Sequence, residues 1–118
     1  MKYILFALLA STAFYGAKAA ERPPLSPSDV FALEEASDPR ISPDGKQVVY
    51  VRSGSDMMKD RRTTQIWIVG VDGSGAKPLT KPGETVGSPR WSPDGTRLAY
   101  TAMRDGAPRI VLRWMADG

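Results

Sequence analysis

The sequence contains no cysteine, no histidine and no asparagine, and each absence excludes a class of site. Without cysteine the chain has no disulfide framework, no zinc finger and no thiol nucleophile. Without histidine it has no imidazole base, so a serine-histidine triad cannot be assembled from this chain alone. Without asparagine it has no N-glycosylation acceptor. We therefore predict no catalytic, no metal-binding and no cofactor-binding residue in this chain.

The composition is that of one small folded domain. The chain has 118 residues, of which 42% are apolar and 25% are charged, and these values exclude a disordered or collagen-like chain. Two of the sixteen basic residues, Lys2 and Lys18, precede all thirteen acidic residues. The other fourteen basic residues nearly balance the thirteen acidic ones and leave a net charge of +1, so we expect no nucleic-acid partner.

The first nineteen residues have the three parts of a secretory signal peptide. Lys2 gives a positive start, the run Tyr3–Tyr15 is mostly apolar, and Ala17-Lys18-Ala19 is an A-x-A cleavage site. We predict a signal peptide at residues 1–19, cleavage between Ala19 and Ala20, and a periplasmic or secreted protein. The alternative is a permanent membrane anchor, but a helix needs about 20 apolar residues to span a bilayer. The run is shorter, so we expect no such anchor.

Residues 20–37 are predicted to form an extended lead followed by a short helix. Ser26 suits the N-cap position, and Asp29, three residues later, completes a variant of the capping box. The helix is predicted near Ser28 to Glu35, and Asp38-Pro39 is predicted to end it. Because so short a helix is not stable alone, we expect it to dock on another element.

The strongest signal in the sequence is an internal repeat. Residues Asp38–Tyr50 recur as Ser88–Tyr100, at an offset of 50, with seven of thirteen positions identical. Self-similarity at a period of this size is typical of solenoids, propellers and arrays.

The core of the repeat is Ser-Pro-Asp-Gly, at residues 42–45 and 92–95. Proline presets the backbone, Ser and Asp side chains bind neighbouring amides, and Gly accepts the left-handed conformation, so each copy predicts a hairpin turn. The strands that follow are Gln47–Val51 and Arg97–Thr101. Because the first does not alternate cleanly with polar residues, we expect it to be covered on both faces.

Each copy continues into further predicted strands, which are Gln65–Val71 and Lys77–Thr80 in the first copy and Arg109–Trp114 in the second. The loop from Ser53 to Thr64 is six residues longer than its counterpart, and we expect it to protrude or to be poorly ordered. Four short antiparallel strands in about fifty residues are typical of a propeller blade.

The predicted fold is therefore all-β, with one to two blades of a β-propeller after the signal peptide and helix. Blade 1 is predicted at residues 38–87, and blade 2 at 88–118 is incomplete because it lacks a fourth strand. Repeat units usually need at least three copies for stability. We therefore expect the front end of a longer protein or a truncated gene product.

Several side chains allow a functional and a structural interpretation. Asp44 and Asp94 could form a carboxylate pair, but local turn bonding explains each of them. The basic stretch at residues 59–62 could bind a partner, but neighbouring acids favour a solvated loop. Asp72–Gly75 is predicted to be a turn, because no Lys-Ser/Thr follows it as in a phosphate loop. The aromatic residues of the repeats could line a channel, but they more often pack between blades; they are Tyr50, Trp67, Trp91, Tyr100 and Trp114.

The two Ser-Pro-Asp-Gly copies, each followed by a strand that carries Tyr50 or Tyr100, resemble the TolB-type β-propeller repeat. Together with the predicted signal peptide, three segments extend the resemblance; they are Leu25–Phe31, Asp56–Arg62 and Ile66–Val69. With them the chain is similar to the amino-terminal part of a secreted bacterial member of the prolyl oligopeptidase family, of the acylaminoacyl-peptidase-like kind.

The resemblance implies a propeller that sits over a carboxy-terminal α/β-hydrolase domain and restricts the access of peptides to a serine nucleophile. The chain has no G-x-S-x-G match and no histidine, so the family's catalytic residues map onto no position here. We therefore expect the non-catalytic propeller portion of a serine-type peptidase. Its expected partners are peptide substrates and the hydrolase domain of the full-length parent.

The alternative is a fragment of a TolB-like periplasmic propeller that binds proteins. TolB carries a separate α/β domain ahead of its propeller, whereas only residues 20–37 lie between the predicted cleavage site and the first repeat. This short lead has room for one extended segment and one helix, so it favours the peptidase.

The absence of a base, a nucleophile elbow and a metal cluster from the sequence predicts that the chain hydrolyses no peptide or ester by itself. The measurement is turnover of chromogenic peptide and ester substrates by purified chain that is free of host peptidases. Turnover that copurifies with the chain and scales with its concentration would contradict the prediction.

Overall fold

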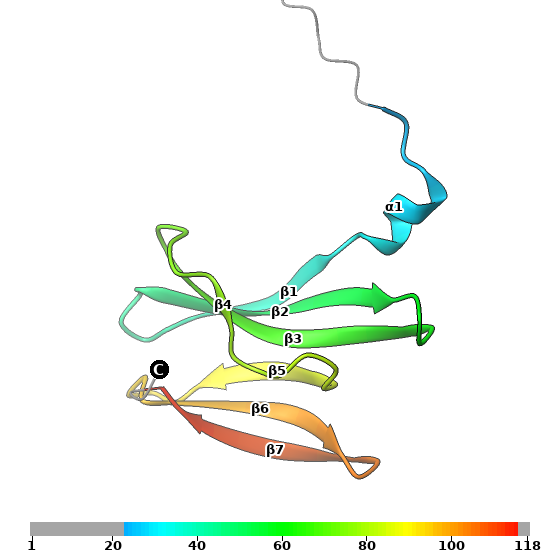
Figure 1. Ribbon diagram of the computed structural model, residues 1–118. Helices are drawn as coiled ribbons and strands as arrows, with labels where there is room; N and C mark the ends of the chain where they lie inside the picture. The colour runs from blue at the N-terminus through cyan, green and yellow to red at the C-terminus, as the bar shows by residue number, and fades with distance from the viewer. Residues whose placement is uncertain (1–22, 116–118) are drawn as a thin grey trace, which may run out of the picture.

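The computed structural model describes residues 23–115, which form one short helix and two antiparallel sheets (Figure 1). The first sheet has the strand order β1-β2-β3-β4 and the second has the order β5-β6-β7. The elements are α1 (Pro27–Phe31), β1 (Glu35–Ile41), β2 (Gln47–Asp56), β3 (Arg61–Gly70), β4 (Lys77–Pro78), β5 (Val86–Trp91), β6 (Arg97–Arg104) and β7 (Ala107–Trp114). This confirms the predicted fold class. The predicted signal peptide and its cleavage site lie outside the described residues.

The predicted Ser-Pro-Asp-Gly turns join β1 to β2 and β5 to β6. In the first turn the Ser42 hydroxyl donates to Asp44 Oδ1 (2.6 Å) and accepts from the Gln47 amide (3.0 Å). Gly45 has φ +72°, a conformation that side chains disfavour, and its amide donates to the Ser42 carbonyl (2.9 Å). The second turn repeats these bonds fifty residues later, at Ser92, Asp94, Gly95 and Arg97.

The helix ends earlier than predicted. The Ser26 amide donates to Asp29 Oδ2 (2.6 Å), as in the predicted capping box, but α1 stops at Phe31 and buries none of its residues. The prediction that Asp38-Pro39 ends the helix is wrong, because this pair lies inside β1. The pairing of β1 with β2 shifts at this point and Asp38 has φ +46°, so a bulge accommodates a proline that has no amide to donate.

The same bulge occurs at Ser88-Pro89 in β5, where Ser88 has φ +53°. The two sheets therefore begin at Glu35 and Val86, a few residues before the repeat itself. The blade boundaries at residues 38 and 88 stay predictions from the repeat.

The expected loop from Ser53 to Thr64 is mostly strand. β2 and β3 continue pairing as far as Asp56 and Arg61, and the turn between them has four residues. In the second sheet the pairing ends at Arg104 and Ala107, with a two-residue turn. Four of the six extra residues therefore lengthen the hairpin, because the ladder satisfies backbone groups that a loop would leave to water.

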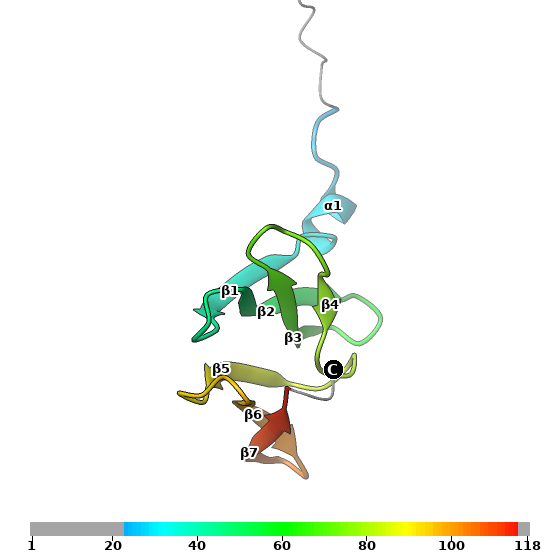
Figure 2. The ribbon, with the colours of Figure 1, turned by 90° about the vertical axis from the view of Figure 1, so that its left-hand side faces the viewer.

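The apolar core lies between the two sheets, which Figure 2 shows as separate layers. The pairs Val49↔Ile68 and Val51↔Ile66 place four buried side chains on one face of the first sheet. The second sheet covers this face with its own buried side chains, which include Val86, Leu98, Tyr100 and Ala102. Leu79, which follows β4, closes one side of the core.

Only one face of β2 is buried, so the expectation that both faces are covered is wrong for the described residues. Val48, Tyr50 and Arg52 point to the other face and are half-buried. Among the aromatic residues predicted to be core, Tyr100 is buried and Trp91 packs against the core, but Trp114 is 61% exposed. The cause is that the described chain supplies two layers, and each layer covers one face of the other.

Truncation of the core should destabilise the fold. Ile66 is completely buried, so Ile66→Ala removes buried methyl groups, leaves a cavity and should lower the free energy of unfolding by about 2–5 kcal/mol. Urea unfolding followed by circular dichroism measures this change. The control is Val71→Ala at a 59% exposed turn position, which should change the free energy little. Equal effects of the two substitutions would contradict the described core.

Candidate functional site

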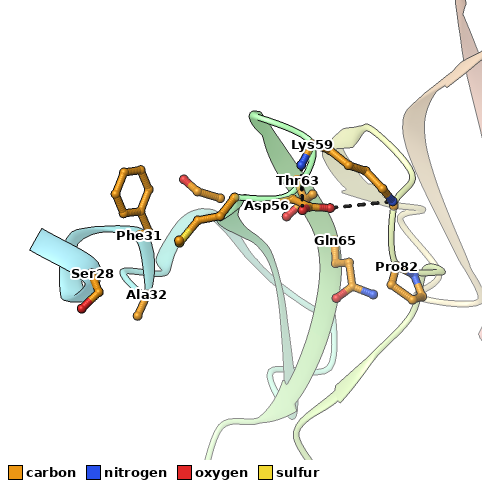
Figure 3. Close-up of a pocket in the computed structure, with 11 residues that line it drawn as sticks. Ser28, Phe31, Ala32, Asp56, Lys59, Thr63, Gln65 and Pro82 are labelled. Atoms are coloured by element: carbon orange, nitrogen blue, oxygen red, sulfur yellow. Dashed lines mark hydrogen bonds and ion pairs between the residues drawn. The ribbon is translucent and has the colours of Figure 1, made fainter.

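The main candidate site is an open hollow at the end of the first sheet where β2 turns into β3. Three elements surround it, which are α1, the β2–β3 turn and the connection from β4 to β5 (Figure 3). Its volume is about 620 Å³. Its lining residues are Ser28, Phe31, Ala32, Ser55, Asp56, Met57, Lys59, Thr63, Gln65, Pro82 and Gly83.

The hollow is apolar on one side and polar on the other. Phe31 and Met57 supply exposed apolar surface, from the helix and from the hairpin turn. Thr63 and Gln65 come from β3. The side-chain amide of Gln65 donates to the Thr80 backbone carbonyl (3.0 Å) and holds the connection after β4 against the strand. The hollow therefore presents apolar and polar groups side by side.

The charged residues of the hairpin turn are engaged locally. Asp56 Oδ1 accepts the amides of Met58 (3.1 Å) and Lys59 (3.2 Å), and Lys59 Nζ lies 3.7 Å from Asp56 Oδ2. Arg62 forms an ion pair with Glu35 and donates to the Ser53 hydroxyl (3.1 Å). These contacts agree with the structural interpretation of the basic stretch at residues 59–62, whose side chains are exposed.

The repeated aspartates are turn residues. Hydrogen bonds from the Ser92 hydroxyl, the Thr96 amide and the Thr96 hydroxyl lower the pKa of Asp94 to about 2. The Ser42 hydroxyl and the Lys46 amide lower the pKa of Asp44 in the same way. Each carboxylate serves its own turn as an ionised acceptor, so the arrangement gives no general acid.

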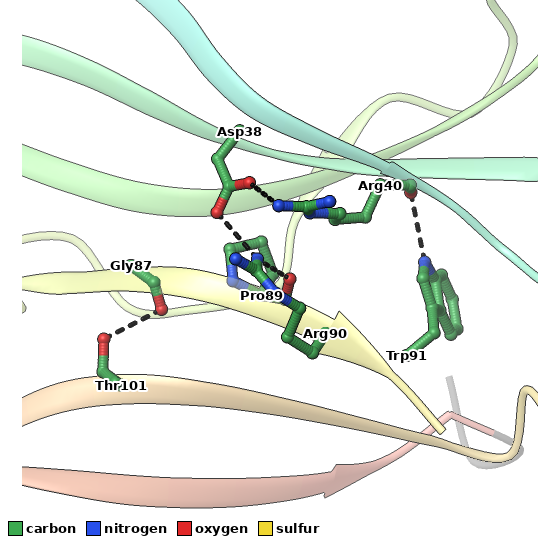
Figure 4. A network of polar contacts seen from close by, with 7 residues as sticks. All are labelled: Asp38, Arg40, Gly87, Pro89, Arg90, Trp91 and Thr101. Atoms are coloured by element: carbon green, nitrogen blue, oxygen red, sulfur yellow. Dashed lines mark hydrogen bonds and ion pairs between the residues drawn. The ribbon is translucent and has the colours of Figure 1, made fainter. Parts of the chain in front are cut away.

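A second polar cluster joins the two sheets along strands β1 and β5 (Figure 4). Asp38 accepts from Arg90 (2.9 Å) and from Arg40 (2.8 Å), and the Trp91 indole donates to the Arg40 carbonyl (3.1 Å). The hydrogen bond from Arg90 is the main cause that lowers the pKa of Asp38, and the charge of Arg40 adds to it. The cluster positions the two sheets and contains no group poised for proton transfer.

Residues 23–115 hold neither a metal cluster nor a membrane-spanning helix. No three His, Cys, Asp or Glu side chains in this range lie together as metal ligands would. None of the helices in the same range has the length and apolar character that a membrane crossing requires.

No protein-family model matches the sequence. The chain is 37% identical over 82 residues to the uncharacterized peptidase YuxL of Bacillus subtilis, a match that covers 70% of this chain and 12% of YuxL. It is 37% identical over 87 residues to dipeptidyl-peptidase 5 of Porphyromonas endodontalis, a match that covers 74% of this chain and 13% of that peptidase. It is also 41% identical over 66 residues to the Tol-Pal system protein TolB of Roseobacter denitrificans, a match that covers 56% of this chain and 14% of TolB.

Two solved structures share its backbone arrangement. The acylaminoacyl peptidase of Pyrococcus horikoshii aligns with a TM-score of 0.60 and 22% identity over 74% of this chain and 13% of that chain. The β-propeller domain of the Trilobed protease from Pyrococcus furiosus aligns with a TM-score of 0.57 and 22% identity, and the alignment covers 71% of this chain and 25% of that chain. The chain is a β-propeller segment. The resemblance to peptidases and to TolB-type repeats is thus confirmed, and the propeller segment spans about one eighth of the length of the two peptidases.

Sequence reasoning located the turns of this propeller segment but missed the hollow and the cluster between the sheets. The hollow combines residues from positions 28 to 83, and no local pattern links them. The repeated Pro-Arg at residues 39–40 and 89–90 was a signal for the cluster between the sheets, because Arg40 and Arg90 both bind the Asp38 carboxylate.

The low pKa of Asp94 makes the fold sensitive to acid. Because the folded-state pKa of about 2 lies below the ordinary 3.8, this carboxylate stabilises the fold above about pH 4, and the contribution is lost as the pH falls through about 2. Asp94→Asn should therefore flatten the decline of the melting temperature between pH 4 and pH 2. Thr96→Val, which removes one of three donors, should have an intermediate effect. Parallel curves for wild type and Asp94→Asn would contradict this assignment.

Proposed function

We propose that this propeller segment is the non-catalytic propeller portion of an exported serine-type peptidase, in which it borders the path of peptides to a hydrolase domain outside this chain. The observation that carries the proposal is the extent of the peptidase matches. They cover 70% and 74% of the chain at 37% identity, whereas matches to TolB proteins cover 51–61% of the chain at 39–43% identity. The signal-peptide pattern at residues 1–19 supports export.

The hollow at the β2–β3 turn is the proposed contact surface for peptides. Met57 and Met58 are 62% and 95% exposed, and flexible thioether side chains adapt to apolar groups of different shapes. The four-residue turn that carries them is longer than the turn of the second sheet, so the first sheet extends further at this end. The exposed methionines and the longer turn also support the proposal that this end of the first sheet gates the access of peptides.

The second candidate is a TolB-like propeller that binds proteins, and the sequence match to TolB supports it. The gene beyond the codon for Gly118 decides between the two. Further Ser-Pro-Asp-Gly units followed by G-x-S-x-G, and then by Asp and His in that order, support the peptidase. A stop codon directly after a completed propeller supports the binding protein and refutes the peptidase.

Peptide contact at the hollow can be tested on this chain. Titration with unlabelled peptides rich in Leu and Phe, followed by amide NMR shifts, should perturb residues around Phe31, 55–63 and 82–83. Met57→Ser with Met58→Ser should weaken binding by roughly threefold or more, since it removes apolar contact surface. Met103→Ser, at an exposed methionine of the second sheet, is the matched control. Shifts spread evenly over the chain, or unchanged by the double substitution, would refute the contact surface.

A further inference from the structure

Two adjacent arginines begin β3, and their polar surroundings differ. Arg62 forms an ion pair with Glu35 and donates to the Ser53 hydroxyl (3.1 Å). Arg61 forms neither an ion pair nor a side-chain hydrogen bond within residues 23–115. Its guanidinium, which is planar and carries five N–H donors, is therefore unpaired in the described part of the chain.

The acidic residue opposite Arg61 is already engaged by the hairpin turn. Asp56 is the cross-strand partner of Arg61 in the β2–β3 ladder. Its carboxylate accepts the amides of Met58 (3.1 Å) and Lys59 (3.2 Å), and Lys59 Nζ lies 3.7 Å from it, as the dashed lines in Figure 3 indicate in part. Asp56 therefore serves the turn and leaves the guanidinium of Arg61 without a counter-ion.

Arg61 stands at the rim of the hollow. Side chains alternate along a strand, so Arg61 shares one face of β3 with Thr63 and Gln65, which line the hollow. A β-carbon at position 83 would lie 3.9 Å from Arg61 Nη2, and Gly83 lines the hollow from the connection between β4 and β5. The guanidinium thus reaches from β3 toward the opposite wall.

Apolar surface lies beside this guanidinium. Arg61 lines a smaller hollow of about 380 Å³, which shares Phe31 and Met57 with the main hollow. Phe31 is 49% exposed and Met57 is 62% exposed. Asp60 also lines the smaller hollow and forms no ion pair with Arg61. A cation and two apolar side chains are therefore available to the same ligand.

The hairpin carries Arg61 beyond the length of the second sheet. By the repeat offset of 50, the last pair of the β6–β7 ladder corresponds to Gly54↔Thr63 of the first sheet. Two more pairs continue the first ladder, and Asp56↔Arg61 is the last of them. A neighbouring blade with strands as long as those of the second sheet would end before Arg61 and would leave its guanidinium accessible.

We propose that Arg61 binds a carboxylate of the peptide while an adjacent apolar side chain of the peptide packs on Phe31 and Met57. The inference rests on the proposed function of the hollow as a contact surface for peptides, and it names the class that the hollow selects. The carboxylate belongs to an acidic side chain or to the carboxyl terminus of the peptide. Either offers two oxygens that match the fork of a guanidinium.

The test compares three peptides with the same Leu-Phe core by the amide NMR titration of the chain. One is neutral and blocked at both ends, the second has Glu after the Phe, and the third has a free carboxyl terminus. Both carboxylate peptides should bind roughly threefold tighter than the neutral one, because an exposed ion pair adds this much. The advantage should shrink as the salt concentration rises. Whichever carboxylate peptide binds more tightly identifies the source of the carboxylate.

Substitution of Arg61 isolates its role. Arg61→Gln should abolish the advantage of both carboxylate peptides and leave the affinity for the neutral peptide unchanged. Arg61→Lys should keep part of the advantage, because it keeps the charge and loses the planar fork. The matched control is Arg109→Gln, which removes the same charge from an exposed position of the second sheet and should keep the full advantage.

Two kinds of failure are distinguishable. Equal affinities of wild type for the three peptides, an advantage that survives in Arg61→Gln, or an equal loss in Arg109→Gln overturns the role of Arg61. If the neutral peptide still shifts the amides around the hollow in these cases, the contact surface itself stands. Shifts around the hollow with none of the three peptides refute the contact surface and the role of Arg61 together. The dispersion of the amide spectrum verifies that each variant is folded, and the wild-type comparison of the three peptides needs no variant.

Discussion

The apolar contact between the two sheets is the interaction on which the rest of the structure depends. A sheet of three or four short strands is stable only when one of its faces is covered, and here each sheet covers the other. Val49, Ile66 and Leu98 are completely buried at the centre of this contact. Because strand side chains alternate between faces, this burial requires that the strands of each sheet pair in the correct register.

The Ser-Pro-Asp-Gly turns set that register. In each turn the serine hydroxyl donates to the aspartate carboxylate and accepts from the amide of the first residue of the following strand, and the glycine amide donates to the serine carbonyl. The bulges at Asp38 and Ser88 then adjust the strand before each turn. At the first bulge, Asp38 is free to bind Arg90 of the neighbouring sheet, so the irregularity that accommodates the proline also supplies a contact between the sheets.

The relation to peptidases and to TolB concerns the β-propeller scaffold. The described residues with a lowered pKa are aspartates whose carboxylates accept hydrogen bonds or form ion pairs. Such carboxylates have a structural role. The first sheet differs from the second in its fourth strand and in the longer β2–β3 hairpin, whose turn forms one wall of the hollow. Loops carried on a rigid sheet are where propellers and other β scaffolds place their binding residues.

Local sequence determined the turns, the capping box at Ser26 and the assignment to propeller blades, because Pro, Gly and short polar side chains restrict the backbone within a few residues of themselves. It did not determine the end of α1 or the pairing of residues 53–56 with 61–64. Those depend on strand partners that supply hydrogen bonds across the ladder. Which face of β2 is buried, the ion pair between Asp38 and Arg90, and the hollow beside Phe31 were decided only by the tertiary structure, because each needs side chains from segments that are distant in the sequence and adjacent only after the sheets have packed.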